Sequence, residues 1–106
     1  FILVPQREGI KEIHHMSAQD QHLLMQESSQ LAQALEDKFT PDKINVAALG
    51  NMVPQLHIHH IARFTSDPSW PKPVWGMLPA KPYEDAAVEE LKQSMFDALP
   101  SLHHLA

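Results

Sequence analysis

The sequence contains no cysteine, and this absence removes several kinds of chemistry. Without a thiol the protein forms no disulfide bond, no thiolate zinc site and no cysteine nucleophile. The chain also has no run of about 20 apolar residues, the length that a transmembrane helix needs. Its apolar start, residues 1–4, meets Pro5 and Arg7 too early for a signal peptide. We therefore expect a soluble, cytoplasmic protein whose chemistry comes from other side chains.

Positive charge is also scarce. Lysine and arginine number 8 against 13 acidic residues, which gives a formal net charge of −5 at pH 7. A surface that binds DNA or RNA needs clustered lysine and arginine to neutralise phosphates. We therefore expect no nucleic-acid partner, whereas a small anionic ligand is compatible with this charge. The lack of a long apolar run leads us to expect no membrane partner.

The length and the hydrophobic pattern predict a single α+β domain over residues 1–106. With 43% apolar residues, 106 residues can form one core and are too few for two domains. Ser17 followed by Asp20 is typical of a helix start, and Thr40 and Pro41 end the helical spacing of leucines. Strands are predicted at residues 1–4, 44–49 and 55–64, helices at 18–38 and 84–99, and an ordered proline-rich loop at 67–82.

Histidine is the residue in excess, with 8 in the chain, and two of them alternate along a predicted strand. The rings of His57 and His59 should share one face, about 6–7 Å apart along the backbone, while Leu56, Ile58 and His60 face the core. Alternating imidazoles suit nucleophilic and acid/base catalysis, two ligands of a metal site, or a solvated sheet face. The metal interpretation requires a third ligand, such as Glu8 or His14. The spacing alone leaves all three open.

The residues around these histidines resemble the signature of the histidine triad superfamily. In that family a glycine turn precedes alternating histidines that are separated by apolar residues. The positions that fall in register are Gly50, Val53, His57, His59 and Arg63. The strand at residues 1–4 and the helix that starts after Ser17 correspond to the family's preceding elements, so the resemblance covers residues 1–64. It implies an antiparallel sheet with two helices, further strands upstream of residue 1, and a homodimer.

The resemblance also implies a function. In the family the central histidine attacks the α-phosphorus of a nucleotide derivative, and water then hydrolyses the nucleotidyl-histidine. His57 corresponds to this nucleophile, and His59 to a residue that binds phosphate or assists the leaving group. Gly50, Asn51 and Gln55 are expected to bind the nucleotide phosphate. The expected substrate is a nucleoside phosphoramidate or a dinucleoside polyphosphate, with neither a cofactor nor a metal ion.

Three positions depart from the family pattern. Gln55 replaces the first histidine of the triad, Asn51 replaces a glutamine that helps to hold phosphate, and Phe1 stands where a further histidine often lies. The backbone carbonyl near Gln55 can still orient the His57 ring, because every residue supplies a carbonyl. The departures leave two alternatives to an active hydrolase: a catalytically weakened nucleotide-binding protein and, less favoured, a histidine-based metal-binding protein.

Overall fold

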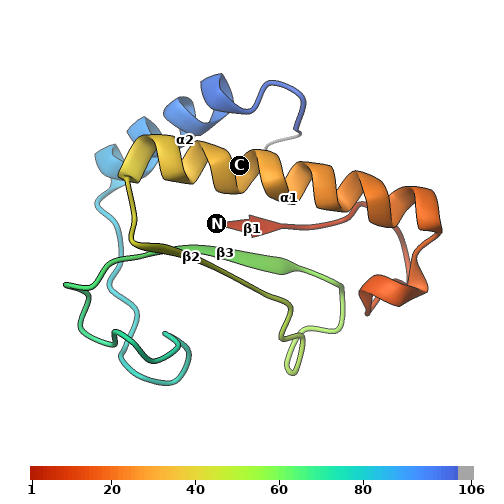
Figure 1. The fold of residues 1–106 in the computed structure, drawn as a ribbon, viewed down its shortest axis with the longest axis horizontal. Coiled ribbons are helices and arrows are strands. Elements are labelled where there is room, and N and C mark those ends of the chain that lie inside the picture. Colours follow the sequence, from red (N-terminus) through yellow and green to blue (C-terminus); the bar gives the residue numbers. More distant parts are fainter. Residues whose placement is uncertain (103–106) are drawn as a thin grey trace. The chain divides into compact units, whose positions relative to one another are not determined.

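The computed structural model describes residues 1–102 and has an α+β fold (Figure 1). The chain divides into two compact units, Phe1–Arg63 and Phe64–Ala106. The first unit holds an antiparallel three-stranded sheet and the long helix α1 (Ala18–Phe39). The second holds an ordered loop and helix α2 (Asp85–Ala98). The predicted fold class is therefore confirmed, while the assignment of residues 1–106 to a single domain stays a prediction.

Helix α1 has the ends that the sequence predicts. The Ser17 hydroxyl accepts a hydrogen bond from the Asp20 backbone N–H at 3.1 Å, and this bond satisfies a donor that the first helical turn leaves without a partner. Asp20 also places negative charge at the positive end of the helix dipole. The helix ends at Thr40, which has a left-handed φ of 45°, just before Pro41. Its bounds differ from the prediction by one residue.

The sheet contains β1 (Ile2–Leu3), β2 (Lys43–Ala47) and β3 (Ile58–Arg63) in the order β1-β3-β2. The central strand β3 pairs antiparallel with both neighbours, and His59 lies between Ile2 and Ala47. Residues paired directly across a sheet project to the same face. Helix α1 lies along one face of the sheet (Figure 1), where the buried Ile58 clusters with Leu24, so the neighbouring His59 projects from the other face. The sheet therefore has one face toward the helix and one face that carries His59.

The alternation predicted around the histidines is present, although the strand is shorter than the predicted range 55–64. Leu56, Ile58 and His60 are all buried, whereas Gln55, His57 and His59 are half-buried. The paired strand starts only at Ile58, because β1 has two residues. Before that point the chain bonds to a loop instead, with the Leu56 N–H donating to the Ile10 carbonyl at 2.9 Å. Residues 55–57 keep the two-sided pattern without being part of the sheet.

The core of the first unit lies between α1 and β3. Leu24 of α1 clusters with Met16, Leu56 and Ile58, and two further apolar side chains pack against this cluster, those of Leu3 and Ile10. Of the others, Leu3 and Ile58 belong to β1 and β3, Leu56 precedes β3, and Ile10 lies in the connection between β1 and α1. The core therefore fixes which side of the histidine segment faces the helix.

A buried histidine connects α1 to β3. The His60 Nδ1 atom lies 3.2 Å from the Ile58 carbonyl oxygen, and its Nε2 atom lies 2.7 Å from the Ser28 hydroxyl. Because a carbonyl only accepts, the proton is on Nδ1, and Nε2 accepts the hydrogen of the Ser28 hydroxyl. Burial lowers the pKa of His60 below its ordinary value. His60 is thus a neutral, hydrogen-bonded core residue, as its place in the alternation suggests.

The second unit starts with a turn that Asp67 organises. The Asp67 carboxylate accepts hydrogen bonds from the backbone N–H groups of Phe64 and Ser69, at 3.2 and 3.1 Å. Helix α2 follows the proline-rich loop and buries Met95, with Leu99 buried at its C-terminal end. Neither α1 nor α2 is long and apolar enough to cross a membrane, a finding that covers residues 1–102.

Two neighbouring leucines of α1 test the position of the core. Leu24 is 8% exposed and Leu23 is 47% exposed. We expect Leu24→Ala to lower the free energy of unfolding by about 2–4 kcal/mol, because it removes buried methyl groups and leaves a cavity. The matched variant Leu23→Ala should change it by less than about 1 kcal/mol. Urea denaturation measures both values, and equal losses would contradict the assigned core.

The buried His60 makes a prediction about pH. Because its folded pKa is lowered, the unfolded chain binds a proton more readily, so the unfolding free energy should fall as pH drops below the ordinary value of 6.5. We expect His60→Asn to have a shallower pH dependence than wild type between pH 7.5 and 5.5. The exposed Leu23→Ala variant, which removes no titratable group, should retain the wild-type slope. Denaturant titrations across this range measure the slopes, and identical slopes for wild type and His60→Asn would refute the assignment.

Candidate active site

The turn before the histidine segment is shaped by Gly50. Gly50 has a φ of 66°, in the left-handed region that glycine adopts without steric cost. Asn51 follows it and is exposed, so its amide can reach a ligand in solvent. The sequence predicts a tight turn at this position; the structure has a bend at residues 51–52, within the longer connection between β2 and β3. Gly50 and Asn51 thus lie on the segment that leads to His57.

His57 is held in a defined orientation by the backbone. Its Nδ1 atom lies 2.8 Å from the carbonyl oxygen of Gln55. Because a carbonyl can only accept, Nδ1 carries the proton of the neutral ring, and Nε2 carries the lone pair. A ring oriented in this way presents one nucleophilic nitrogen, and its direction is fixed by the bond at the other nitrogen.

His59 lies beside His57, on the same side of the segment. The two ring centroids are 5.2 Å apart and the ring planes make an angle of 65°. The pKa of His59 is lowered, first by burial and then by the charge of His57 when that ring is protonated. The two imidazoles are therefore close enough to contact one ligand, and they disfavour being charged together.

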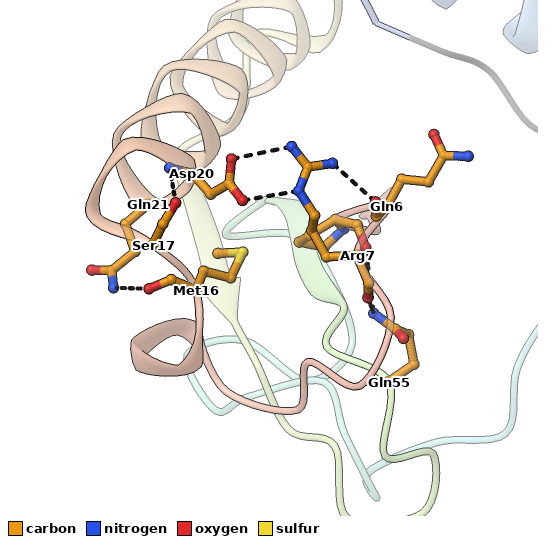
Figure 2. A network of polar contacts seen from close by, with 8 residues as sticks. Gln6, Arg7, Met16, Ser17, Asp20, Gln21 and Gln55 are labelled. Atoms are coloured by element: carbon orange, nitrogen blue, oxygen red, sulfur yellow. Dashed lines mark hydrogen bonds and ion pairs between the residues drawn. The ribbon is translucent and has the colours of Figure 1, made fainter.

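Gln55 is also close to His57, but its side chain faces another part of the chain. Its Nε2 atom lies 3.3 Å from the Pro5 carbonyl oxygen and 3.4 Å from that of Arg7. Figure 2 shows Gln55 beside the connection between β1 and α1, where Arg7 also contacts Asp20. The structure thus brings His57, His59 and Gln55 together. The phosphate-binding roles of Gly50, Asn51 and Gln55, and the catalytic roles of His57 and His59, stay predictions.

Two residues that the family resemblance singles out, Arg63 and Phe1, make contacts within the first unit. Arg63 is 2% exposed, and its Nη1 donates to the Asn45 side-chain oxygen at 2.8 Å. Phe1 extends the pairing of β1, because its carbonyl oxygen accepts the His60 N–H at 2.7 Å. Neither contact was predictable from a local pattern.

The metal interpretation needs a third ligand next to the paired histidines. Within residues 1–102, no group of three or more histidine, cysteine, aspartate or glutamate side chains is arranged to hold a metal ion. His14, one of the two suggested ligands, lies in the short helix η1 (Ile13–His15) with its ring against that of His15, the centroids 4.6 Å apart. The other, Glu8, is exposed. The sequence has one more histidine pair that could bind a metal ion, His103 and His104, and it lies outside the described residues.

Sequence reasoning missed the contacts that surround Gln55. The Arg7 guanidinium binds both carboxylate oxygens of Asp20, at 2.9 and 3.1 Å. Asp20 has a sequence signal as part of a helix start, but no local pattern indicates that Arg7 is its partner. The Ser28 hydroxyl that binds His60 likewise has no signal, because nothing in the helix pattern distinguishes it from Ser29.

A central antiparallel strand, a long helix on one face and a glycine turn that leads to two adjacent imidazoles define a histidine triad fold. The HIT domain family model matches residues 1–66, and the chain belongs to this family. The further strands that the resemblance implies upstream of residue 1 stay a prediction. None of the curated proteins matches the chain at a significant level.

Three crystal structures of histidine triad proteins are similar to this chain. That of Marinobacter aquaeolei VT8 is 47% identical with a TM-score of 0.91, over 96% of this chain and 74% of that one. The protein of Sinorhizobium meliloti 1021 is 42% identical with a TM-score of 0.88, over 92% and 73%. That of Bradyrhizobium japonicum is 40% identical with a TM-score of 0.88, over 92% and 72%. The HIT-like fold therefore extends to nearly the whole chain.

Proposed function

We propose that the protein hydrolyses a nucleotide derivative, or transfers its nucleotidyl group, by attack at the α-phosphate. The substrate class is a nucleoside phosphoramidate or a dinucleoside polyphosphate. The observation that carries this proposal is the 2.8 Å contact between His57 Nδ1 and the Gln55 carbonyl, because it leaves Nε2 as the free nucleophilic nitrogen. Membership of the HIT family supports a nucleotide as the ligand.

In the first step the lone pair of His57 Nε2 attacks the α-phosphorus. A phosphorus–nitrogen bond forms, and the bond to the leaving group breaks with its electron pair going to the leaving group, which takes up a proton. A neutral imidazole has a free lone pair at one ring nitrogen and needs no separate base to attack. The positive charge that develops on the ring is stabilised by the Gln55 carbonyl that accepts the Nδ1 proton.

In the second step water attacks the nucleotidyl-histidine. The phosphorus–nitrogen bond breaks, a nucleoside monophosphate leaves, water loses a proton to solvent or a nearby base, and His57 returns to its neutral form. Another nucleophile in place of water gives transfer instead of hydrolysis. His59 contacts a phosphate oxygen or the leaving group, since its ring lies 5.2 Å from that of His57. No step requires a metal ion.

The turn at Gly50 contributes hydrogen-bond donors to the phosphate. Asn51 donates its amide hydrogens to a nonbridging oxygen, and backbone N–H groups next to Gly50 add to the stabilisation of charge in the transition state. We also propose that two copies of the chain form a homodimer, as the family resemblance implies. The alternative function is nucleotide binding without turnover, which the replacements at Gln55, Asn51 and Phe1 favour.

Covalent trapping tests the proposed nucleophile. Wild-type protein mixed with nucleoside 5′-phosphoramidates labelled at phosphorus should form an adduct that acid releases and alkali preserves, as expected for a phosphorus–nitrogen bond. His57→Asn should form no adduct and lose turnover by about 1,000-fold or more, because the nucleophile is absent. The exposed His22→Asn variant serves as the control and should behave as wild type. Nucleotide binding by wild type with neither adduct nor turnover would establish the alternative.

Asn51 should contribute less than the nucleophile. We expect Asn51→Ala to lower kcat/KM by about 10- to 100-fold, the effect of losing a hydrogen bond to a charged group. Asn51→Asp should lower it further, because a carboxylate repels the phosphate. Steady-state kinetics with the best substrate of the trapping experiment measure both. An unchanged kcat/KM in Asn51→Ala would remove Asn51 from the phosphate site.

A further inference from the structure

The backbone carbonyl and the side chain of Gln55 contact different partners. Its carbonyl accepts the His57 Nδ1 proton, while its amide nitrogen contacts two carbonyls of the β1–α1 connection. We propose that the Gln55 side chain is a positioning residue, which fixes the carbonyl that orients the His57 ring. The catalytic part of this proposal rests on the proposed function, in which His57 is the nucleophile.

The amide of Gln55 matches its two partners in number and in polarity. The side-chain nitrogen has two hydrogens, and it lies 3.3 Å from the Pro5 oxygen and 3.4 Å from the Arg7 oxygen. The next residue adds a third bond to the same connection, since the Leu56 N–H donates to the Ile10 carbonyl at 2.9 Å. The segment that carries the orienting carbonyl is therefore held at three points to the connection between Pro5 and Ile10.

The connection is itself anchored to α1. Arg7 Nε and Nη2 bind the two oxygens of Asp20 at 2.9 and 3.1 Å, and Arg7 Nη1 donates to the Gln6 carbonyl at 3.0 Å (Figure 2). Asp20 lies in the first turn of α1, whose start Ser17 caps. An exposed ion pair adds little to stability, but a bidentate pair fixes direction. The Arg7 side chain therefore ties the connection, whose Arg7 carbonyl contacts Gln55, to the first turn of α1.

These contacts assign Gln55 a role other than the phosphate contact that the resemblance implies. The amide nitrogen contacts two carbonyl oxygens, one for each of its hydrogens, so these contacts compete with a phosphate oxygen for the same donors. The remaining amide oxygen is an acceptor and would repel phosphate. A continuous series of bonds thus runs from Asp20 through Arg7 and the Gln55 side chain to the Gln55 carbonyl and His57.

Nitrogen-15 NMR of the histidine rings tests the positioning without requiring turnover. In ligand-free wild type, His57 should be the Nδ1–H tautomer, with its resonances assigned by their loss in His57→Asn. Gln55→Met keeps the length of the side chain and removes the donor. We expect this variant to show a mixture of His57 tautomers, a kcat about 10- to 100-fold lower and a KM within about twofold of wild type, because a displaced nucleophile slows the reaction more than it weakens binding.

Two further variants complete the test. Gln33 donates to Asp37 at 2.9 Å on the exposed surface of α1, so Gln33→Met is a matched control and should change neither tautomer nor kcat. Arg7→Met leaves the core intact and should shift the tautomer in the same direction as Gln55→Met. The double variant should lose no more kcat than Gln55→Met alone, because both residues act through one series of bonds. If Gln55→Met fails to fold, Arg7→Met supplies the tautomer measurement.

The outcomes separate this proposal from the proposed function. A raised KM with an unchanged His57 tautomer in Gln55→Met would make Gln55 a phosphate ligand and overturn the positioning role. A lowered kcat with an unchanged tautomer would overturn it as well. A shifted tautomer in a protein whose wild type forms no adduct would support the positioning of the ring, while the nucleotidyl-histidine mechanism would fail.

Discussion

The hydrogen bond between His57 Nδ1 and the Gln55 carbonyl, 2.8 Å long, determines which nitrogen of the imidazole can react. A free imidazole exchanges its proton between two nitrogens, whereas a ring that donates to a fixed carbonyl keeps its lone pair on the other one. The bond uses a backbone carbonyl, so it does not require a histidine side chain at position 55. The side chain at this position is consequently available for another task, and in this protein it binds the β1–α1 connection.

The two faces of the histidine segment depend on each other. Leu56, Ile58 and His60 are buried toward α1, and this burial directs His57 and His59 to the opposite side. A slip of the chain by one residue would place the His57 and His59 rings in the core and expose the apolar side chains, so the hydrophobic effect opposes it strongly. The Ser28–His60 hydrogen bond adds a directional contact to the same arrangement. The packing of the apolar side chains against α1 therefore determines the side of the segment on which His57 and His59 lie.

The parts of the structure that the sequence predicts are those that local physics decides. Helix α1 follows from the Ser17 cap, its apolar spacing and the stop at Thr40, and the positive φ of Gly50 follows from the turn chemistry of glycine. The strand bounds are less accurate, since β3 begins at Ile58 only because β1 offers a short partner. The partners of Gln55 and Arg7 could not be predicted, because these contacts join residues that only the folded chain brings together.

Three imidazoles within four positions acquire different properties from their surroundings. His57 is oriented by a carbonyl, His60 is neutral between Ser28 and Ile58, and burial lowers the pKa of His59. In the proposed mechanism the difference matters when His57 becomes positively charged during attack on phosphorus. A protonated His59, with its ring 5.2 Å away, would oppose that charge, and the lowered pKa of His59 reduces the fraction of molecules in which it does so. In this mechanism a neutral His59 therefore favours attack by His57 Nε2. The lone pair is on this nitrogen because Nδ1 donates its hydrogen to the Gln55 carbonyl.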